Sequence, residues 1–264
     1  MRKRTNNRNK EAERVRAARM AVRAGGEPKR SYVREMFNRI APAYDRINLI
    51  ISLGQTSLWR FRALRLLPLV SGGEVLDLGC GTGAATRGLR RRLPHAFVIG
   101  ADLAEGMVRY ATVIDPEGIY LQADAAALPI RDNQLDAVVS FFTLRNFADR
   151  IVVLDEILRV LKPGGYALLL DAFPPSGPGW WKRFHAFWLE SVIPRAAALV
   201  APDEGYVYLG ESILTMTDLA RLITHLESRP ARLAALRSFS LGSALALLVE
   251  RMDNRLLVPV ERAR

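Results

Sequence analysis

Short hydrophobic runs recur along the chain between residues 74 and 250, and more polar stretches of helical character separate them. Each run has the length of a strand and offers apolar side chains to both faces, which is typical of strands buried inside a parallel sheet. The first five runs have room between them for crossover helices, so they predict a mostly parallel sheet with helices on both faces. The seven runs are Glu74–Leu78, Phe97–Ala101, Gly118–Gln122, Leu135–Ser140, Gly165–Asp171, Ala231–Arg237 and Ala244–Glu250.

The residues before the first run show a different pattern. Between about residues 31 and 70, apolar side chains recur at helical spacing, with an interruption at Pro42. This spacing predicts a helical cap that precedes the sheet. The apolar positions of the cap are Met36, Phe37, Ile40, Leu58, Phe61, Leu64 and Leu67.

An aromatic segment interrupts the alternation at residues 173–209. It opens with a rigid turn-rich linker at residues 174–179 and continues into a helical stretch whose rings mostly share one face. Such a stripe is more often core packing, which is our first interpretation. The alternatives are that the rings line an apolar substrate pocket or contact lipid. The aromatic residues are Trp180, Trp181, Phe184, Phe187 and Trp188.

The net charge of +11 is concentrated at one end of the chain. Residues 1–30 hold 11 Lys and Arg against three acids, which leaves a net charge of only +3 for the remaining 234 residues. We therefore expect a basic tail at 1–30, disordered or loosely helical, followed by one domain at 31–252 and a short C-terminal tail at 253–264. The tail is interpreted first as a solubilising extension, second as a contact for an anionic membrane surface, and third as an RNA contact.

Composition narrows the class of protein. The single cysteine, Cys80, excludes a disulfide framework and a Cys-rich zinc site, and we expect no metal site. No apolar run approaches the roughly 18 residues that span a bilayer, and no apolar stretch follows the basic N-terminus as in a secretory signal. We therefore expect a cytoplasmic protein, peripheral to the inner face of the membrane if the basic tail binds lipid.

The clearest chemical motif follows the first strand. Residues 75–83 read Val-Leu-Asp-Leu-Gly-Cys-Gly-Thr-Gly, a buried strand that enters a glycine turn, and a helix is expected at Ala84–Arg92. Glycines let the backbone approach a ligand, and the helix N-terminus offers unpaired N–H groups. The pattern also satisfies a relaxed dinucleotide fingerprint, with Asp102 at the distance of a ribose-binding acid. The glycine turn alone therefore leaves a nicotinamide cofactor open.

Carboxylates at successive strand ends favour a different ligand. Asp77 lies two residues before Gly79, where it suits a cationic amino group and would repel a pyrophosphate. Asp102 can accept both hydroxyls of a ribose, and Asp124 with Ala125 suits an adenine amine and its flat flank. Ligands of such sheets bind at the carboxyl ends of the strands, where all three acids fall. Together with residues 161–165, Leu-Lys-Pro-Gly-Gly, this order of motifs resembles class I S-adenosylmethionine-dependent methyltransferases, which have a Rossmann-like fold.

A narrower resemblance covers about residues 32–249. The N-terminal signature at 37–45, Phe-Asn-Arg-Ile-Ala-Pro-Ala-Tyr-Asp, is similar to that of the ubiquinone/menaquinone biosynthesis C-methyltransferase family, as are Leu-Arg-Asn at 144–146 and Glu-Ser-Ile at 211–213. The chain departs from the family at Thr56, where His is usual, at Asp171-Ala172-Phe173, where Glu-Phe-Ser is usual, and at Met216-Thr217, where Phe-Pro is usual. None of these departures touches the cofactor motif, but they leave the quinone undetermined.

The resemblance implies cofactor contacts at Thr82, Asp102, Asp124, Ala125 and Ser140, and the positions of other residues add further candidates. Arg145, Asn146 and Tyr44 are our candidates for orienting the acceptor oxygen or a water, and a salt bridge from Arg145 to an acid such as Asp149 is the structural alternative. His185 is an alternative base, whereas we place His225 in a packing position and His95 in a loop. The expected S-adenosylmethionine contacts are Asp77, Gly79, Gly81, Thr82, Gly83, Asp102, Asp124, Ala125 and Ser140.

The implied activity is C-methylation of a polyprenylated quinol precursor, demethylmenaquinol or a ubiquinol precursor. The implied partners are that quinol, an anionic membrane surface reached through the basic tail and the Trp-rich segment, and a second copy in a homodimer. Another small aromatic or lipid acceptor and a non-catalytic binding subunit are the remaining alternatives. A base-amine methyltransferase would carry Asp/Asn-Pro-Pro-aromatic after the fourth strand, where this chain reads Ser-Phe-Phe-Thr at 140–143, which argues against nucleic acid.

Overall fold

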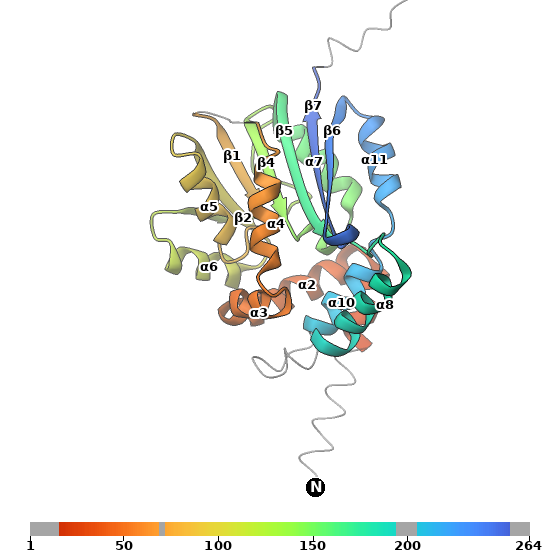
Figure 1. Ribbon diagram of the computed structural model, residues 1–264. Coiled ribbons are helices and arrows are strands. Elements are labelled where there is room, and N and C mark those ends of the chain that lie inside the picture. The colour runs from red at the N-terminus through yellow and green to blue at the C-terminus, as the bar shows by residue number, and fades with distance from the viewer. Residues whose placement is uncertain (1–15, 69–71, 194–204, 254–264) are drawn as a thin grey trace, which may run out of the picture.

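A computed structural model describes residues 16–68, 72–193 and 205–253 (Figure 1). A seven-stranded sheet runs through this part of the chain with the order β3-β2-β1-β4-β5-β7-β6. The first five strands pair in parallel, and β7 runs antiparallel to both β5 and β6. The strands are β1 (Glu74–Leu78), β2 (Phe97–Asp102), β3 (Ile119–Gln122), β4 (Leu135–Phe141), β5 (Leu161–Ala172), β6 (Ala231–Phe239) and β7 (Ala244–Arg251).

This architecture confirms the predicted α/β fold, including all seven strands to within a few residues at each end. The order of the strands reverses between β1 and β4, because β2 and β3 lie on one side of β1 and β4 to β7 lie on the other. Such a reversal opens a crevice at the carboxyl ends of the strands. The ends of β1 and β4 are therefore the place to look for a ligand.

Helices cover both faces of the sheet (Figure 1). On one face, α4 (Gln55–Leu64) and α5 (Ala84–Arg92) pack against alternate residues of the central strands, such as Val75 and Val139. On the other face, α7 (Arg150–Val160) and α11 (Leu219–Glu227) pack against the intervening residues, such as Leu76. The helix α6 (Glu105–Ile114) packs against β2 and β3. Burial on both faces explains why the strands read as continuous apolar runs.

The predicted cap consists of α2 (Gly26–Ile40), η1 (Ala41–Ala43), α3 (Tyr44–Ile51) and α4. Residues 16–24 are also helical, and α2 begins at Gly26. The boundary expected after residue 30 was therefore wrong, because it falls inside a helix that packs against the domain through Val33 and Met36. Residues 1–15 of the basic tail and 254–264 of the C-terminal tail lie outside the described residues.

The aromatic segment forms α8 (Gly179–Phe187) and the π-helical η3 (Trp188–Val192), and α10 (Gly205–Leu214) follows. None of the α8 side chains is buried, and those of Trp180 and Phe187 are 65% and 58% exposed. Core packing was therefore the wrong first interpretation of this stripe. Two short 3-10 helices complete the described fold: η2 (Leu144–Asn146) after β4 and η4 (Ser240–Gly242) between β6 and β7.

Candidate active site

Two cavities meet at the carboxyl ends of β1 and β4. The aspartate cavity, of about 260 Å³, is lined by Asp102, Asp124 and Ala125. The aromatic cavity, of about 190 Å³, is lined by side chains of α3, α4, α8 and η3, including Trp59, Trp181 and Trp188. Five residues line both cavities and form their common wall: Tyr44, Gly79, Gly81, Phe141 and Phe142.

The glycine turn between β1 and α5 builds part of this wall. Gly79 has a φ of +72°, and a Cβ there would come within 2.1 Å of the Thr143 side chain. Gly83 has a φ of +77° just before the first residue of α5, and its Cβ would lie 2.4 Å from the Tyr120 hydroxyl. Both positions therefore require glycine, and the tight turn leaves the backbone open to a ligand beside the N-terminus of α5.

Asp77 is almost completely buried in β1 and lines the aromatic cavity beside the glycine turn. The hydroxyl of Thr86 on α5 donates to its Oδ2 atom at 2.6 Å. Burial raises the pKa of Asp77 to about 6, because a buried carboxylate loses the solvation of its charge. A ligand with a positive charge would offset this loss, as expected for a cationic amino group.

Asp102 lies at the end of β2 and lines the aspartate cavity. The backbone N–H groups of Gly81 and Ala104 each donate to one of its carboxylate oxygens at 2.9 Å. These two bonds fix the orientation of the carboxylate against the glycine turn, and each oxygen retains a further lone pair for a ribose hydroxyl. Burial raises the pKa of this carboxyl as well.

Asp124 and Ala125 line the same cavity, although β3 ends at Gln122 and Asp124 follows it in a short bridge to Ala127. Arg30 of α2 forms an ion pair with Asp124, with the Nη2 atom 2.6 Å from Oδ2. The first turns of α2 therefore cover this end of the cavity. This contact was not predicted, because residue 30 was expected to lie in a tail.

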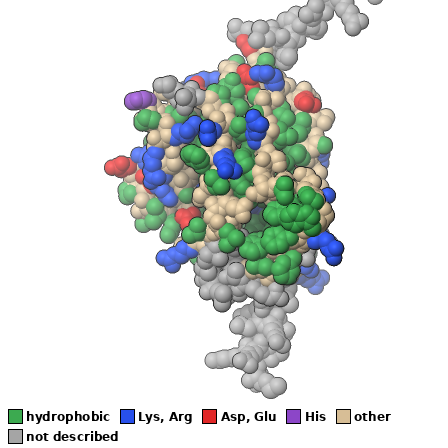
Figure 2. Space-filling model, in the orientation of Figure 1, with side chains coloured by type: hydrophobic (Ala, Val, Ile, Leu, Met, Phe, Trp, Pro, Cys, Tyr) green, Lys and Arg blue, Asp and Glu red, His purple; other side chains and the backbone are tan. Residues whose placement is uncertain are grey.

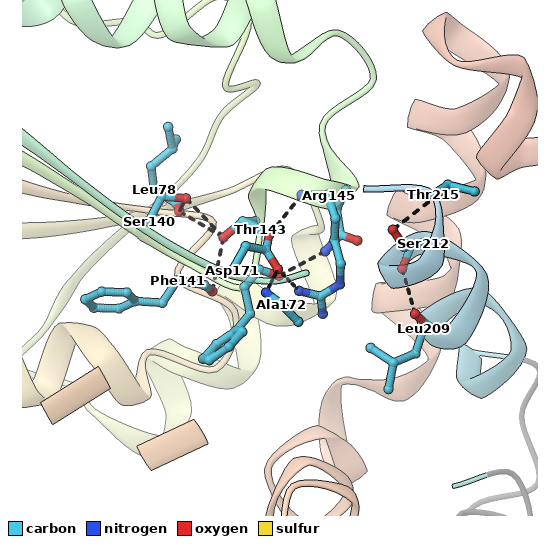
Figure 3. A network of polar contacts seen from close by, with 12 residues as sticks. Leu78, Ser140, Phe141, Thr143, Arg145, Asp171, Ala172, Leu209, Ser212 and Thr215 are labelled. Carbon is cyan, nitrogen blue, oxygen red and sulfur yellow. Dashed lines mark hydrogen bonds and ion pairs between the residues drawn. The ribbon is translucent and has the colours of Figure 1, made fainter. Parts of the chain in front are cut away.

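Thr82 and Ser140 have their hydroxyls engaged within the protein. The Thr82 hydroxyl donates to Asp45 of α3 at 2.8 Å, which ties the cap to the glycine turn, and Thr82 lines the aromatic cavity. The Ser140 hydroxyl donates to the carbonyl oxygen of Leu78 at 2.9 Å (Figure 3). Ser140 lines neither of the two cavities, and its side chain joins β4 to β1, so its contact with the ligand stays a prediction.

Arg145 lies in η2 and lines the aromatic cavity, and both it and its partner Asp171 at the end of β5 are buried. The guanidinium forms an ion pair with the Asp171 carboxylate, and the backbone N–H of Arg145 donates to Asp171 Oδ2 at 2.9 Å (Figure 3). Burial alone would lower the pKa of Arg145, but the Asp171 charge raises it. Asp149 was the wrong partner, because its carboxylate caps α7. The sequence signal that could have identified Asp171 as the partner of Arg145 is the position of Asp171 at the end of a strand.

The other two candidates for the reaction lie on different walls. Tyr44 lines both cavities, and burial raises the pKa of its hydroxyl. Asn146 lines only the aspartate cavity, where its Nδ2 donates to the carbonyl oxygen of Phe142 at 3.3 Å and its Oδ1 is buried without a partner. The structure therefore brings Tyr44 and Arg145 together at the aromatic cavity and places Asn146 on the other side of the common wall.

The three histidines differ in their surroundings. His185 lines the aromatic cavity, its Nδ1 atom is buried without a partner, and burial lowers its pKa. The ring of His225 contacts Asp155 at 2.8 Å in a packing position, and His95 lies in a turn. His185 is thus the imidazole that can take part in chemistry at this site.

The donor set fits S-adenosylmethionine. Asp77 suits the ammonium group, Asp102 suits the ribose and Asp124 suits the adenine amine, and Gly79 and Gly81 of the glycine turn line both cavities. A pyrophosphate would meet these carboxylates with like charge. The arrangement therefore favours the sulfonium cofactor over a nicotinamide dinucleotide.

Comparisons with known proteins agree with this geometry. Residues 26–246 match the model of the ubiE/COQ5 methyltransferase family. The chain is 37% identical to a demethylmenaquinone methyltransferase of Thermotoga maritima over 72% of this chain and 83% of the relative. It is 35% identical to a demethylmenaquinone methyltransferase of Clavibacter sepedonicus over 86% and 92%. It is also 36% identical to a ubiquinone/menaquinone biosynthesis C-methyltransferase UbiE of Syntrophotalea carbinolica over 68% and 77%.

Solved structures show the same fold. An S-adenosylmethionine-dependent methyltransferase of Aquifex aeolicus superposes with a TM-score of 0.53 at 18% identity, over 73% of this chain and 89% of that one. One from Mesorhizobium loti gives a TM-score of 0.51 at 22% identity, over 72% and 96%. With the glycine turn, the three carboxylates and the family match, the chain belongs to the ubiE/COQ5 methyltransferase family and is an S-adenosylmethionine-dependent methyltransferase.

Proposed function

We propose that this enzyme methylates a ring carbon of a polyprenylated quinol, either demethylmenaquinol or a ubiquinol precursor. The observation that carries the proposal is the common wall: an apolar, aromatic cavity adjoins the aspartate cavity through Tyr44, Gly79, Gly81, Phe141 and Phe142. A flat ring in the aromatic cavity would therefore lie next to the cofactor. The names of the relatives from Thermotoga maritima and Syntrophotalea carbinolica support a quinone precursor as the acceptor.

The bound cofactor supplies an electrophilic methyl group on a sulfonium. The protein has to hold the acceptor carbon in line with that group and exclude water, and such positioning can supply roughly 7–11 kcal/mol of the barrier. A quinol ring becomes nucleophilic at carbon when its phenolic oxygen loses a proton. Tyr44 and Arg145 line the cavity where that oxygen would lie, and the Arg145 charge would stabilise the phenolate.

A base must accept the phenolic proton, and the methylated ring carbon must then lose its hydrogen as a proton so that the ring becomes aromatic again. Arg145 stays protonated at neutral pH, so it can orient the oxygen but cannot act as the base. Among the described residues that line the aromatic cavity, His185 is the neutral imidazole, because burial lowers its pKa. The proposal therefore assigns proton removal to His185.

The rim of the aromatic cavity suits loading from a membrane. Leu53 and Phe184 line the cavity and are still 68% and 48% exposed, so the cavity reaches the surface at an apolar rim. Trp180 and Phe187 of α8 extend this rim, and Figure 2 shows a large hydrophobic patch in this part of the molecule. The exposed cations Lys182 and Arg183 of α8 add charge that suits anionic lipid.

Flotation with anionic liposomes tests the membrane contact. We expect the chain to float with phosphatidylglycerol vesicles and to lose flotation when Trp180 and Phe187 are both replaced by Ser. The reason is that these two side chains would be buried in the membrane interface and would provide the hydrophobic contribution to binding. Removal of residues 1–30 also takes away part of α2, so the tail is tested by removing residues 1–15. Equal flotation of the intact chain and the rim variant would refute the contact through α8.

Mass analysis of lipid extracts tests the reaction itself. Cells that lack this gene should accumulate a quinone lighter by one methyl group, and the intact gene should restore the mass. An unchanged quinone profile would refute the proposed substrate and direct attention to another aromatic or lipid acceptor. A rescue by an Asp102→Ala variant would favour a non-catalytic binding subunit.

In the described residues, no helix is both long and apolar enough to cross a bilayer. We propose a cytoplasmic enzyme at the inner membrane face. The expected homodimer is tested by light scattering of the purified chain, where a mass near 29.4 kDa would contradict it.

A further inference from the structure

Arg60 of α4 lines the aromatic cavity, as do Gly79 and Gly81 of the glycine turn. Its Nη2 atom lies 3.5 Å from the Ser57 hydroxyl, at the limit of a hydrogen bond. Its Nε atom is buried without a partner, and within the described residues no carboxylate lies at ion-pair distance from it. A buried donor without an acceptor costs free energy, so this guanidinium is suited to an anionic group that enters the cavity.

Asp77 lines the same cavity as Arg60. Burial raises the pKa of Asp77, and the positive charge of Arg60 opposes this increase. Arg60 acts in the same way on Tyr44, whose pKa burial also raises. A carboxylate and a guanidinium therefore face the same space without forming an ion pair with each other. This arrangement matches the two charges of an amino-acid group, one ammonium and one carboxylate.

The other guanidinium of the aromatic cavity is already paired. Arg145 forms a buried ion pair with Asp171, so its charge is compensated within the protein. The cofactor of this family carries its only carboxylate on the methionyl end, next to the ammonium that Asp77 suits. Among the described residues that line the cavity, Arg60 is therefore the guanidinium that is available to bind this carboxylate.

We propose that Arg60 binds the carboxylate of the methionyl group of S-adenosylmethionine, opposite the contact between Asp77 and the ammonium. The inference rests on the cofactor and not on the quinol, so it stands if the enzyme binds the cofactor and methylates another acceptor. Because α4 belongs to the cap, the cofactor would join the cap to the sheet through Arg60, in addition to the Thr82–Asp45 hydrogen bond.

Calorimetric titration of the full chain with two ligands tests this proposal. S-adenosylhomocysteine carries the amino-acid group, and 5′-methylthioadenosine shares its adenosine part but lacks that group. We expect Arg60→Met to weaken binding of S-adenosylhomocysteine by about ten- to a hundredfold, as for loss of a charged hydrogen bond, and to leave methylthioadenosine unchanged. The control is Arg62→Met, because Arg62 is exposed on the same helix and should change neither affinity.

Two further measurements complete the test. Arg60→Lys keeps the charge and should restore part of the affinity for S-adenosylhomocysteine, and circular dichroism with thermal melting checks that each variant is folded. The proposal is overturned if Arg60→Met binds S-adenosylhomocysteine as tightly as the original chain, or loses both ligands equally. A variant that keeps its cofactor affinity but raises the KM for the quinol would instead place Arg60 at the phenolic oxygen and would also overturn it.

Discussion

Replacement of Asp77 by Asn should change stability and cofactor affinity in opposite directions. In the protein without ligand, burial raises the pKa of Asp77 from 3.8 to about 6, and each pKa unit corresponds to about 1.4 kcal/mol. The ionised carboxylate therefore costs about 3 kcal/mol at pH 8. Asn keeps the acceptor for the Thr86 hydroxyl but adds an amide N–H group that needs a partner, at a cost of about 1 kcal/mol.

The direction in which stability changes with pH follows from the direction of the pKa shift of Asp77. Because the folded pKa lies above the unfolded one, the neutral form contributes its full stability below pH 3.8, and that contribution is lost as the pH rises to about 6. Asp77→Asn should thus be about 1–3 kcal/mol more stable than the original chain at pH 8, and this difference should fall steadily between pH 6 and pH 4.

Chemical denaturation at a series of pH values measures the stability, and calorimetry at pH 8 measures the affinity for S-adenosylhomocysteine. We expect the variant to bind this ligand at least about tenfold more weakly, because the ammonium loses a charged partner. The reasoning is refuted if the variant is less stable at pH 8 and binds the ligand as tightly as the original chain. A stability difference that does not depend on pH would also contradict the shifted pKa of Asp77.

Three further predictions test other parts of the site. Gly79→Ala should destabilise the fold by at least about 1–2 kcal/mol, given its positive φ and the 2.1 Å contact with Thr143, while Gly88→Ala in open space within α5 should be neutral or stabilising in the same melts. Arg145→Met or Asp171→Asn alone should cost about 3–5 kcal/mol of unfolding free energy, because each leaves a buried charge without its partner. The double variant Arg145→Met/Asp171→Leu should recover much of this stability, and a failure to recover it would contradict a simple buried ion pair. His185→Gln should lower kcat by about a hundredfold or more and remove the acid limb of the pH profile, and an unchanged profile would rule it out as the base.

The sequence predicted the elements that depend on local pattern. Runs such as Leu135–Ser140 are buried on both faces, so their hydrophobicity alone located the strands, and the glycine turn located the start of α5. It also predicted that Asp77 and Asp102 lie where the strands end, and the structure puts each of them in the lining of one of the two cavities.

Contacts between segments far apart in sequence were not predictable in this way. The Arg30–Asp124 and Arg145–Asp171 pairs join residues 94 and 26 positions apart along the chain, and no local pattern encodes either pairing. The stripe of α8 was misread because helical spacing shows which residues share a face but not what covers that face. The bond from the Ser140 hydroxyl to the neighbouring strand is a further contact that no local pattern encodes.

Methyl transfer in vitro tests the central claim most directly. The purified chain is incubated with S-adenosylmethionine carrying a ¹³C-labelled methyl group and a short-chain demethylmenaquinol, and the product is examined by mass spectrometry and carbon NMR. The account predicts one labelled methyl group bound to a ring carbon, and none when Asp102→Ala replaces the original chain. Label on oxygen, or no transfer by a chain that binds the cofactor, would contradict it.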